Sequence, residues 1–196
     1  MESEILKSNT LLKEITDEVL AEKVKAGSKE AYTELVKRYM KKAYSIAYQF
    51  VRNSEDAKDL SQDVFIKIYQ SISSFKKGRK FFSWFYRILI NHCINFKKKK
   101  SISGFNIEEL KGYTNSNSTV ESEIDKEINH SELKGAVHKA ISKLPLKQRK
   151  VVILCEIEGF KQQEVSEILK ISVGTVRSRL FYARKRLKKY LKNYLI

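Results

Sequence analysis

The sequence predicts an all-α protein made of two small helical domains joined by a flexible acidic linker. Three observations predict this fold class. The 196-residue chain has one proline and seven glycines, so residues that end helices or form the tight turns of sheets are few. Apolar residues recur every three or four positions over long stretches, as on one face of a helix. Basic residues form two blocks on either side of an acidic segment.

The charge pattern divides the chain into domains. Lys and Arg number 39 against 23 Asp and Glu, which gives a net charge of +16. Residues 1–105 carry a net +9, residues 106–142 a net −3, and residues 143–196 a net +10. The acidic segment contains Gly112–Thr119, a small, polar and aperiodic run that is typical of a flexible linker. We therefore predict an N-terminal extension (1–15), a first domain (16–100), a linker (101–127) and a second domain (128–196).

The first domain is expected to contain four helices. Thr16 and Ser28 are predicted N-caps of the first two, and Gly27 ends the first. Ser54 is the predicted N-cap of the third, which has acidic residues at the positive end of its dipole. The fourth begins near Phe81 and runs to about Lys99. The apolar positions expected to face the core on the second and third helices are Ala31, Leu35, Tyr39, Ala43, Ile46, Phe50, Leu60, Val64, Ile68 and Ile72.

The second domain is also expected to contain four helices. The first ends before Pro145, and the next runs from Leu146 to Glu158, closed by Gly159. A short helix around residues 165–169 follows. A long basic helix then extends from about Ser172 to Tyr194.

Residues 162–180 have the pattern of a helix-turn-helix. Ser166 is small enough for close helix crossing, and Ile171 and Val176 can fill the space between the helices. Ser172 can cap the second helix, whose N-terminal N–H groups then face a phosphate. A helix inserted by its N-terminal half reaches base edges in the major groove, which favours DNA binding over a merely solvated basic face. The candidate DNA contacts are Ser172, Thr175, Arg177, Ser178, Arg179, Phe181, Tyr182, Arg184 and Lys185.

The third predicted helix has an acidic-polar face within a strongly basic domain. Acidic residues spaced at i, i+3 and i+7 suggest docking to a basic protein partner. The alternative is that these acids only complement the helix dipole and aid solubility. The residues of this face are Asp56, Asp59, Gln62 and Asp63.

Aromatic and basic residues crowd together between residues 75 and 100. This combination suits single-stranded nucleic acid, because bases stack on rings while the backbone pairs with positive charge. The alternative is that the aromatic residues belong to the core, and we expect this for Trp84 and Phe85.

Composition and motifs exclude several other classes. No apolar run approaches the roughly 20 residues of a membrane span, and the N-terminus has no secretory signal. Cys93 and Cys155 are far apart without CxxC spacing, so we expect reduced, partly buried thiols and no metal site. His92, His130 and His138 are scattered, and the sequence contains no HExxH motif, no P-loop and no pair of carboxylates at a persuasive spacing, so we expect no catalytic residue, no cofactor and no enzyme. The net charge favours nucleic acid as partner first and an acidic membrane surface second.

Three segments resemble one known family. Residues 55–65 (EDAKDLSQDVF) are similar to the DAEDLxQEvF signature of extracytoplasmic-function (ECF) sigma factors in the sigma-70 family. Residues 82–91 (FSWFYRILIN) resemble the second signature of that group. Residues 164–187 resemble its third, EIAeiLgis-x-GTVkSRL-x-rARkrL. The motifs occur in order and cover the chain apart from the N-terminal extension and the linker.

The resemblance implies a bacterial cytoplasmic protein that binds core RNA polymerase and directs promoter recognition, melting and transcription initiation. The acidic face would dock on the clamp helices, the second domain would read the minus-thirty-five element and seat on the flap, and the linker would thread the RNA path. Promoter DNA is then a partner, an anti-sigma factor is allowed as another, and no membrane insertion is expected. The residues that would hold the melted minus-ten element are Lys76, Lys77, Arg79, Lys80, Asn91, Asn95, Lys98 and Lys99.

The sequence departs from the family pattern at several positions. Asn95 stands where many members have Asp, and Tyr182 where Arg is frequent. Lys170 replaces the glycine of the turn, which predicts a non-glycine residue at positive φ. The alternative function is a helix-turn-helix regulator that binds duplex DNA without polymerase, but it leaves the motifs of the first domain unexplained.

Overall fold

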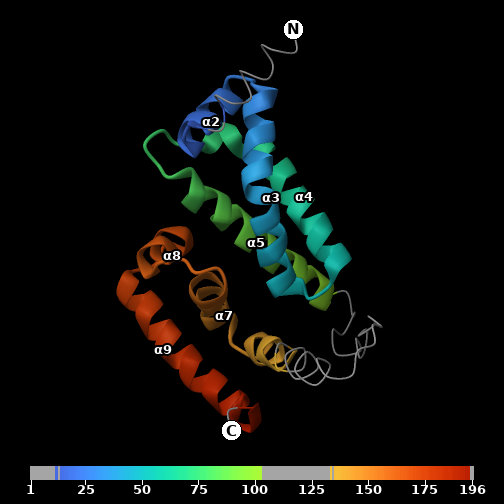
Figure 1. Cartoon of the computed structure of the whole chain (residues 1–196), viewed down its shortest axis with the longest axis vertical. Helices are drawn as coiled ribbons and strands as arrows, with labels where there is room; N and C mark the ends of the chain where they lie inside the picture. The colour runs from blue at the N-terminus through green and yellow to red at the C-terminus, as the bar shows by residue number, and fades with distance from the viewer. Residues whose placement is uncertain (1–11, 13, 103–132, 134, 195–196) are drawn as a thin grey trace, which may run out of the picture. The chain divides into compact units, whose positions relative to one another are not determined.

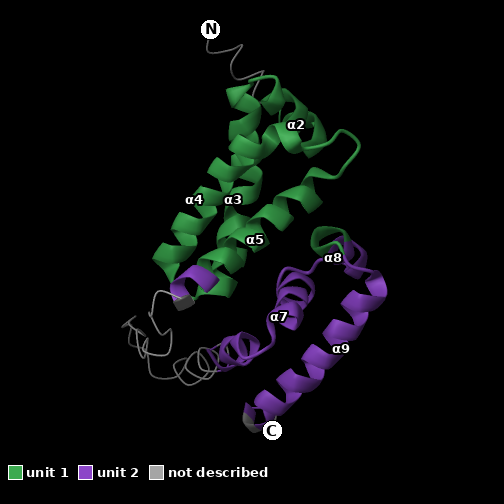
Figure 2. Cartoon of the chain, turned by 180° about the vertical axis from the view of Figure 1, so that it is seen from behind, with its two compact units in different colours: residues 1–97, 167–170 green, residues 98–166, 171–196 purple. Residues whose placement is uncertain are grey.

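The structure is a computed structural model that describes residues 12, 14–102, 133 and 135–194 (Figure 1). These residues form helices and turns and contain no strand, which confirms the all-α prediction. The chain divides into unit 1, residues 1–97 with 167–170, and unit 2, residues 98–166 with 171–196 (Figure 2). The predicted linker lies outside the described residues apart from 101 and 102. Of the predicted N-terminal extension only residues 12, 14 and 15 are described.

Unit 1 contains the helices of the first predicted domain. They are α2 (Asp17–Lys25), α3 (Lys29–Val51), α4 (Ser54–Ser71), the short 3-10 helix η1 (Ile72–Ser74) and α5 (Phe81–Ile102). The Thr16 hydroxyl accepts a hydrogen bond from the N–H of Val19 at 3.4 Å, and that of Ser28 accepts one from Ala31 at 3.2 Å. Both predicted caps are therefore confirmed.

The predicted cap of α4 is wrong by one residue. The side chain of Asn53, not that of Ser54, accepts the N–H of Asp56 at 2.9 Å. Asn53 has extended backbone geometry, as an N-cap requires, whereas Ser54 is already the first helical residue. Both residue types are good caps, so only the backbone conformation distinguishes them.

The core of unit 1 lies between α3, α4 and α5. Every apolar position predicted to face it on α3 and α4 is buried, including Ile72 in η1. Rings from three helices meet there: the Tyr39 and Phe85 centroids are 4.5 Å apart, and Phe65 and Phe85 are 5.6 Å apart. Phe85 is fully buried, as expected. This packing makes α5 a rigid support for the residues on its outer face.

Charged groups tie the start of α2 to α3. The Arg38 guanidinium donates to the Asp17 carboxylate at 2.7 Å and to the Glu34 carboxylate at 2.9 Å. The Tyr39 hydroxyl also donates to Asp17. Burial, and then the Asp17 carboxylate, raises the pKa of Tyr39 above its ordinary value. The network holds the start of α2 against α3.

The described residues after α5 form four helical segments that belong to unit 2, apart from residues 167–169 at the end of the third segment, which are grouped with unit 1. Residues 135–142 are helical, followed by α7 (Leu146–Val152) with the π-helix η3 (Ile153–Ile157), then α8 (Gln162–Leu169) and α9 (Val173–Tyr190). A 3-10 turn, η4 (Lys192–Tyr194), ends the described chain. Arg149 donates to the carbonyl oxygens of Ile141 at 3.2 Å and Leu144 at 3.0 Å, and so joins α7 to the preceding helical segment.

The expected helix from Leu146 to Glu158 is not uniform. It is α-helical to Val152 and then changes to the wider π-helix. Val151, Val152, Ile153 and Leu154 are all buried across this change, so the core of unit 2 is continuous through it. Gly159 follows at φ 73°, the left-handed conformation predicted for the residue that closes the helix.

Membrane spanning finds no support in the described helices. None of them combines the length and the apolar character that a crossing of the bilayer requires.

Candidate nucleic-acid and polymerase interfaces

The acidic-polar face lies on the outer surface of α4. Asp59, Gln62 and Asp63 are exposed, and Asp56 is half-buried at the N-terminal end. The opposite side of α4 carries the buried core positions, since a helix with one apolar stripe leaves the other side to solvent. The structure therefore brings all four predicted residues together on one helix surface.

Asp63 has a neighbour that the sequence did not indicate. The Nε2 atom of His92 on α5 lies 3.4 Å from the Asp63 carboxylate. The pKa of His92 is lowered, first by burial and then by Lys67, while Asp63 opposes the shift. The pair joins the acidic face to the helix that carries the predicted minus-ten residues.

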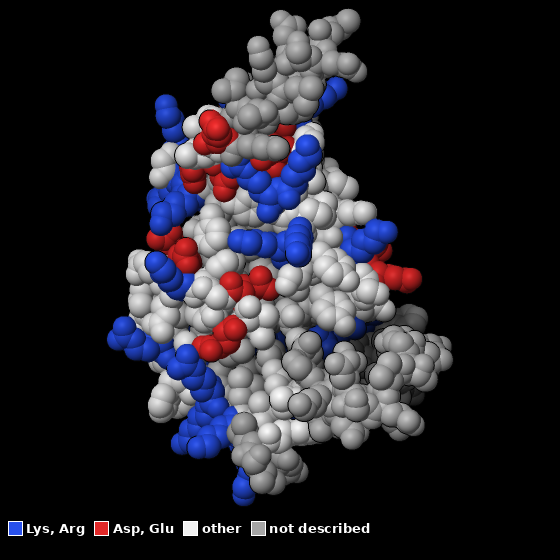
Figure 3. All heavy atoms as spheres, in the orientation of Figure 1, with Lys and Arg blue, Asp and Glu red and all other residues white. Residues whose placement is uncertain are grey.

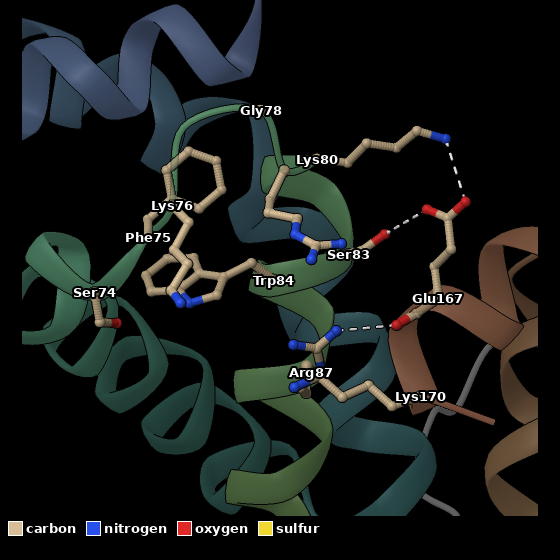
Figure 4. A pocket seen from close by; sticks show the side chains of 11 residues that line it. Ser74, Phe75, Lys76, Gly78, Lys80, Ser83, Trp84, Arg87, Glu167 and Lys170 are labelled. Atoms are coloured by element: carbon tan, nitrogen blue, oxygen red, sulfur yellow. Dashed lines mark hydrogen bonds and ion pairs between the residues drawn. The ribbon is translucent and has the colours of Figure 1, made fainter.

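The predicted minus-ten loop is a cationic segment between two buried aromatic residues. Lys76, Lys77, Arg79 and Lys80 are all exposed, whereas Phe75 and Phe81 are buried. Gly78, at the crest of the loop, has φ 80°, a left-handed conformation that favours glycine (Figure 4). The loop thus exposes four positive charges on a short, anchored turn.

Trp84 differs from its prediction. It is half-buried rather than part of the closed core, and its ring packs 5.5 Å from Phe75 and 5.7 Å from Phe81. It lies beneath the loop, beside Phe75 (Figure 4). The apolar density of this segment could not separate it from Phe85, because a helix turns both residues toward the same broad face. Its partly open ring is available beside the cations.

The predicted minus-ten residues of α5 share one side of the helix. Asn91, Asn95, Lys98 and Lys99 are exposed and step by three or four positions, apart from the adjacent lysines. The inner side of the same helix is buried through Leu89, Ile90 and Cys93. Burial raises the pKa of Cys93 to about 12, so its thiol stays protonated near neutral pH.

Sequence reasoning missed two residues that contact the backbone at the ends of this loop. The N–H of Phe81 donates to the Glu18 carboxylate at 3.0 Å, and the Lys25 ammonium donates to the carbonyl oxygen of Phe75. Both belong to α2, 63 and 50 residues away in the chain. No local pattern signals such contacts.

The helix-turn-helix has the predicted internal geometry. The Ser166 hydroxyl donates across the turn to the carbonyl oxygen of Ile171 at 2.7 Å. Lys170 adopts φ 51°, the positive value predicted for the residue that replaces the turn glycine. Val176 is fully buried between the helices, and Ile171 is half-buried. The Ser172 hydroxyl accepts the N–H of Thr175 at 3.1 Å, which confirms the cap of α9.

The outer face of α9 exposes the candidate DNA contacts of the second domain. Arg177, Ser178, Phe181, Tyr182 and Lys185 are exposed, with Phe181 at 64% of its full accessible area. Ser172 and Arg184 are exposed too, whereas Thr175 and Arg179 are half-buried. Lys and Arg side chains gather along α9 at the lower left of the space-filling view (Figure 3). The Arg184 guanidinium pairs with the Glu156 carboxylate at 2.7 Å, so part of its charge is compensated within unit 2.

Metal chemistry has no visible basis in the described part of the chain. No three His, Cys, Asp or Glu side chains within it lie close enough together to hold an ion. Cys93 and Cys155 are both free thiols.

Two family models match the chain. Residues 35–102 match the model described as "Sigma-70 region 2", and residues 134–187 match "Sigma-70, region 4". The first range contains the acidic face and the loop, and the second contains the helix-turn-helix.

Curated relatives match over most of their own length. The "RNA polymerase sigma-H factor" of Pseudomonas aeruginosa is 30% identical, with 94% of this chain and 98% of the relative covered. The "ECF RNA polymerase sigma factor SigW" of Bacillus subtilis is 34% identical, with 87% and 94% covered. The "ECF RNA polymerase sigma-E factor" of Escherichia coli is 33% identical, with 87% and 92% covered.

Solved structures share the fold. CnrH, determined in complex with the cytosolic domain of CnrY, has a TM-score of 0.67 at 24% identity, with 90% of this chain and 97% of that chain covered. The sigma factor RpoE of Bartonella quintana, determined with the anti-sigma factor NepR, has a TM-score of 0.61 at 23% identity, with 82% and 96% covered.

Proposed function

Because the chain belongs to the sigma-70 family of RNA polymerase sigma factors, with relatives named as ECF members, we propose which of its surfaces carry each step of promoter recognition. The chain is a sigma factor that binds core RNA polymerase and directs it to promoters for transcription initiation. The domain limits of 16–100 and 128–196 belong to the proposal. They are supported by the two ranges that the family models match.

The observation that carries the proposal is that unit 1 has one acidic surface and a separate basic surface. The exposed acids of α4 sit in a segment with a net charge of +9, while the loop 76–80 exposes four cations. A surface built only for nucleic acid would have no reason to expose aligned acids. We assign Asp56, Asp59, Gln62 and Asp63 to docking on the clamp helices of core polymerase.

We assign the loop and the outer side of α5 to the melted minus-ten strand. The four loop cations can neutralise phosphates, and Trp84 offers a partly open ring for stacking. Asn91 and Asn95 can offer amide groups to an extruded base. A short irregular loop cannot lie in the major groove as a helix does, so its cations suit a flexible single strand better than a duplex.

We assign the helix-turn-helix to the minus-thirty-five duplex. The capped N-terminus of α9 can bind a phosphate, and Arg177, Ser178 and Tyr182 follow on the exposed face that would meet base edges. The apolar surface of the second domain would seat on the polymerase flap, and the acidic segment 101–127 would thread the RNA path. We place this activity in the bacterial cytoplasm.

The experiment that tests the loop uses holoenzyme on a promoter selected by that holoenzyme from a randomised duplex library. Residues 75–80 are exchanged for those of another ECF member. The exchange is expected to change which minus-ten bases support transcription on the closed promoter. On the same promoter opened by a mismatched bubble, it should still change affinity for the non-template strand. A change confined to intact-duplex affinity would contradict the assignment.

An anti-sigma factor is a further proposed partner. The support is that the RpoE structure was determined with an anti-sigma factor bound. A protein that co-purifies with the full chain and releases it when core polymerase is added would satisfy the proposal. A co-purifying protein that leaves core binding unaffected would contradict it.

A further inference from the structure

The loop 76–80 is closed at its base by two phenylalanines. Phe75 and Phe81 are buried at 2% and 1% exposure, and their ring centroids lie 5.7 Å apart in an edge-to-face arrangement. The five residues between them are all exposed. Both ends of the loop are therefore anchored in the core, while the residues between them are exposed.

Helix α2 contacts the backbone at both anchors. The Lys25 ammonium donates to the carbonyl oxygen of Phe75 and lies 5.5 Å from the centre of its ring. The Glu18 carboxylate accepts the N–H of Phe81 at 3.0 Å. Glu18 and Lys25 are about two helical turns apart, so they lie on the same side of α2.

Each contact is a hydrogen bond between a charged side chain of α2 and a backbone group at one end of the loop. Phe81 is the first residue of α5, and its N–H is one of the groups left without a partner inside the helix. A carboxylate there also meets the positive end of the helix dipole. The carbonyl oxygen of Phe75, the residue directly after η1, accepts the hydrogen bond from the Lys25 ammonium. Hydrogen bonds to charged groups are stronger than those between neutral groups.

The rest of unit 1 holds α2 rigidly. Arg38 and Tyr39 bind Asp17 at the start of α2, and Leu20, Ala21 and Val24 are buried along it. Glu22 pairs with Lys25 at 3.1 Å and steadies its ammonium. Because α2 is held by the core of unit 1, the core and not the loop itself sets the position of the two loop ends.

We propose that Glu18 and Lys25 are positioning residues for the melted minus-ten strand: together they fix both ends of the cationic loop, so that its side chains receive the strand without first being ordered. A loop that must be ordered on binding loses affinity to that cost. A loop set in one geometry also distinguishes bases, since a mobile loop can adapt to the wrong one. This inference rests on the proposed single-strand role of the loop.

The test uses holoenzyme assembled from core polymerase and the full chain, on the library-selected promoter in duplex and bubble forms. Glu18→Met and Lys25→Met remove the two contacts, whereas Glu18→Gln keeps an acceptor and Lys25→Arg keeps a donor. Glu14→Met and Lys23→Met are matched controls, because both side chains are exposed and neither is among the loop contacts described above. The readouts are core affinity, the midpoint of thermal unfolding, strand affinity on the bubble, and the affinity ratio between the preferred minus-ten base and a substituted one.

Each Met variant is expected to bind the bubble about tenfold more weakly, the low end of the range for the loss of one hydrogen bond to a charged group. The base-preference ratio should fall together with the affinity for the bubble, while the affinities for core polymerase and for the duplex promoter stay at the wild-type values. Glu18→Gln and Lys25→Arg should recover most of the ratio, and the control variants should match wild type.

A merely structural role predicts a different result. It would lower the unfolding midpoint and the fraction of active protein but leave the base-preference ratio unchanged, and that result would overturn the inference. The double variant Lys76→Ala with Lys80→Ala distinguishes the strand-binding role of the loop from the positioning role of Glu18 and Lys25. If this pair weakens bubble binding and the Met variants do not, the positioning role is wrong and the loop assignment stands. If the pair has no effect either, the loop assignment itself fails, and the positioning role fails with it.

Discussion

Arg177 lies in the first turns of α9, on the face that would enter the major groove. Its side chain is exposed and follows the Ser172 cap by about one and a half turns. An arginine there can form a bidentate contact with guanine. Arg177→Ala is expected to cost about 1–3 kcal/mol of binding free energy at one base pair and to relax the preference at that position. Competition binding of holoenzyme to single-base variants of the minus-thirty-five element measures both effects.

Lys189 supplies the control for this prediction. It is exposed near the C-terminal end of α9, beyond the turns that reach base edges. Lys189→Ala should weaken all sequences alike or have no effect, because a phosphate contact carries no base information. An unchanged minus-thirty-five preference in Arg177→Ala would show that the register assigned to α9 is wrong.

His92 gives unit 1 a pH dependence. Burial lowers the pKa of its imidazole in the folded chain, whereas the pKa of a histidine in the unfolded chain is about 6.5. As the pH falls below that value, the unfolded state binds a proton that the folded state does not yet bind. The stability is therefore fully present above the unfolded pKa and is lost as the pH falls through the folded pKa.

Urea unfolding followed by Trp84 fluorescence at pH 7.5 and at pH 5.5, both chosen to bracket about 6.5, checks this prediction. The free energy of unfolding should be lower at the acidic pH, and His92→Gln should reduce the difference. Other titrating groups remain in both proteins, so only the change between them is diagnostic. Equal pH differences in the two proteins would contradict it.

At the scale of elements, the residues of α4 proposed to bind core polymerase and those that stabilise the fold lie on opposite faces of the helix. Its outer face carries the acids and its inner face carries the core, so charge reversal outside should leave the helix intact. Asp59→Lys with Asp63→Lys is expected to abolish co-purification with core polymerase. Loss of a partner in a buried charged pair costs about 2–5 kcal/mol, and reversal should cost at least as much.

The control for α4 is Glu14→Lys with Glu30→Lys, which adds the same charge at exposed positions on other segments. This pair should still co-purify with core polymerase. Circular dichroism should show native helicity for both double variants. Retained core binding in the α4 double variant would remove α4 from the docking surface.

At the scale of the whole molecule, each unit has its own hydrophobic core. Leu60 is buried in unit 1 and Leu154 in unit 2. The chain has one tryptophan, Trp84, which lies in unit 1 and therefore reports on that unit alone. Truncating a buried leucine to alanine costs about 2–5 kcal/mol. Leu60→Ala is therefore expected to shift the unfolding curve measured by Trp84 fluorescence, whereas Leu154→Ala should leave it in place.

Far-UV circular dichroism supplies the second half of this measurement. It reports on helices of both units, so Leu154→Ala should shift part of its transition and separate it from the fluorescence curve. Coincident shifts of both probes in Leu154→Ala would mean that the two units unfold as one.

The sequence alone determined the features that arise within one or two helical turns. The sequence identifies Thr16, Ser28 and Ser172 as caps, and every listed core position of α3 and α4 is buried, because capping and amphipathic periodicity depend on near neighbours. The small buried residues Ala47 and Ala57 were not predicted. The positive φ of Lys170 followed from its place in the turn. The motifs sufficed for the family because they combine buried positions such as Leu60 and Val176 with exposed ones such as Asp59 and Arg177 at fixed spacings along the chain.

Tertiary structure decided what depends on packing between distant segments. The N-cap of α4 is Asn53 and not the predicted Ser54, because the backbone conformation, and not the residue type, distinguishes two adjacent capping residues. Trp84 is half-buried against the Phe75 and Phe81 rings, and this partial burial depends on where the loop packs and not on the local sequence. Glu18 and Lys25 reach the loop only after α2 packs on unit 1, across 63 and 50 residues of chain. Such contacts have no local signature, since the energy that selects them comes from burying α2 and not from the residues at either end of the bond.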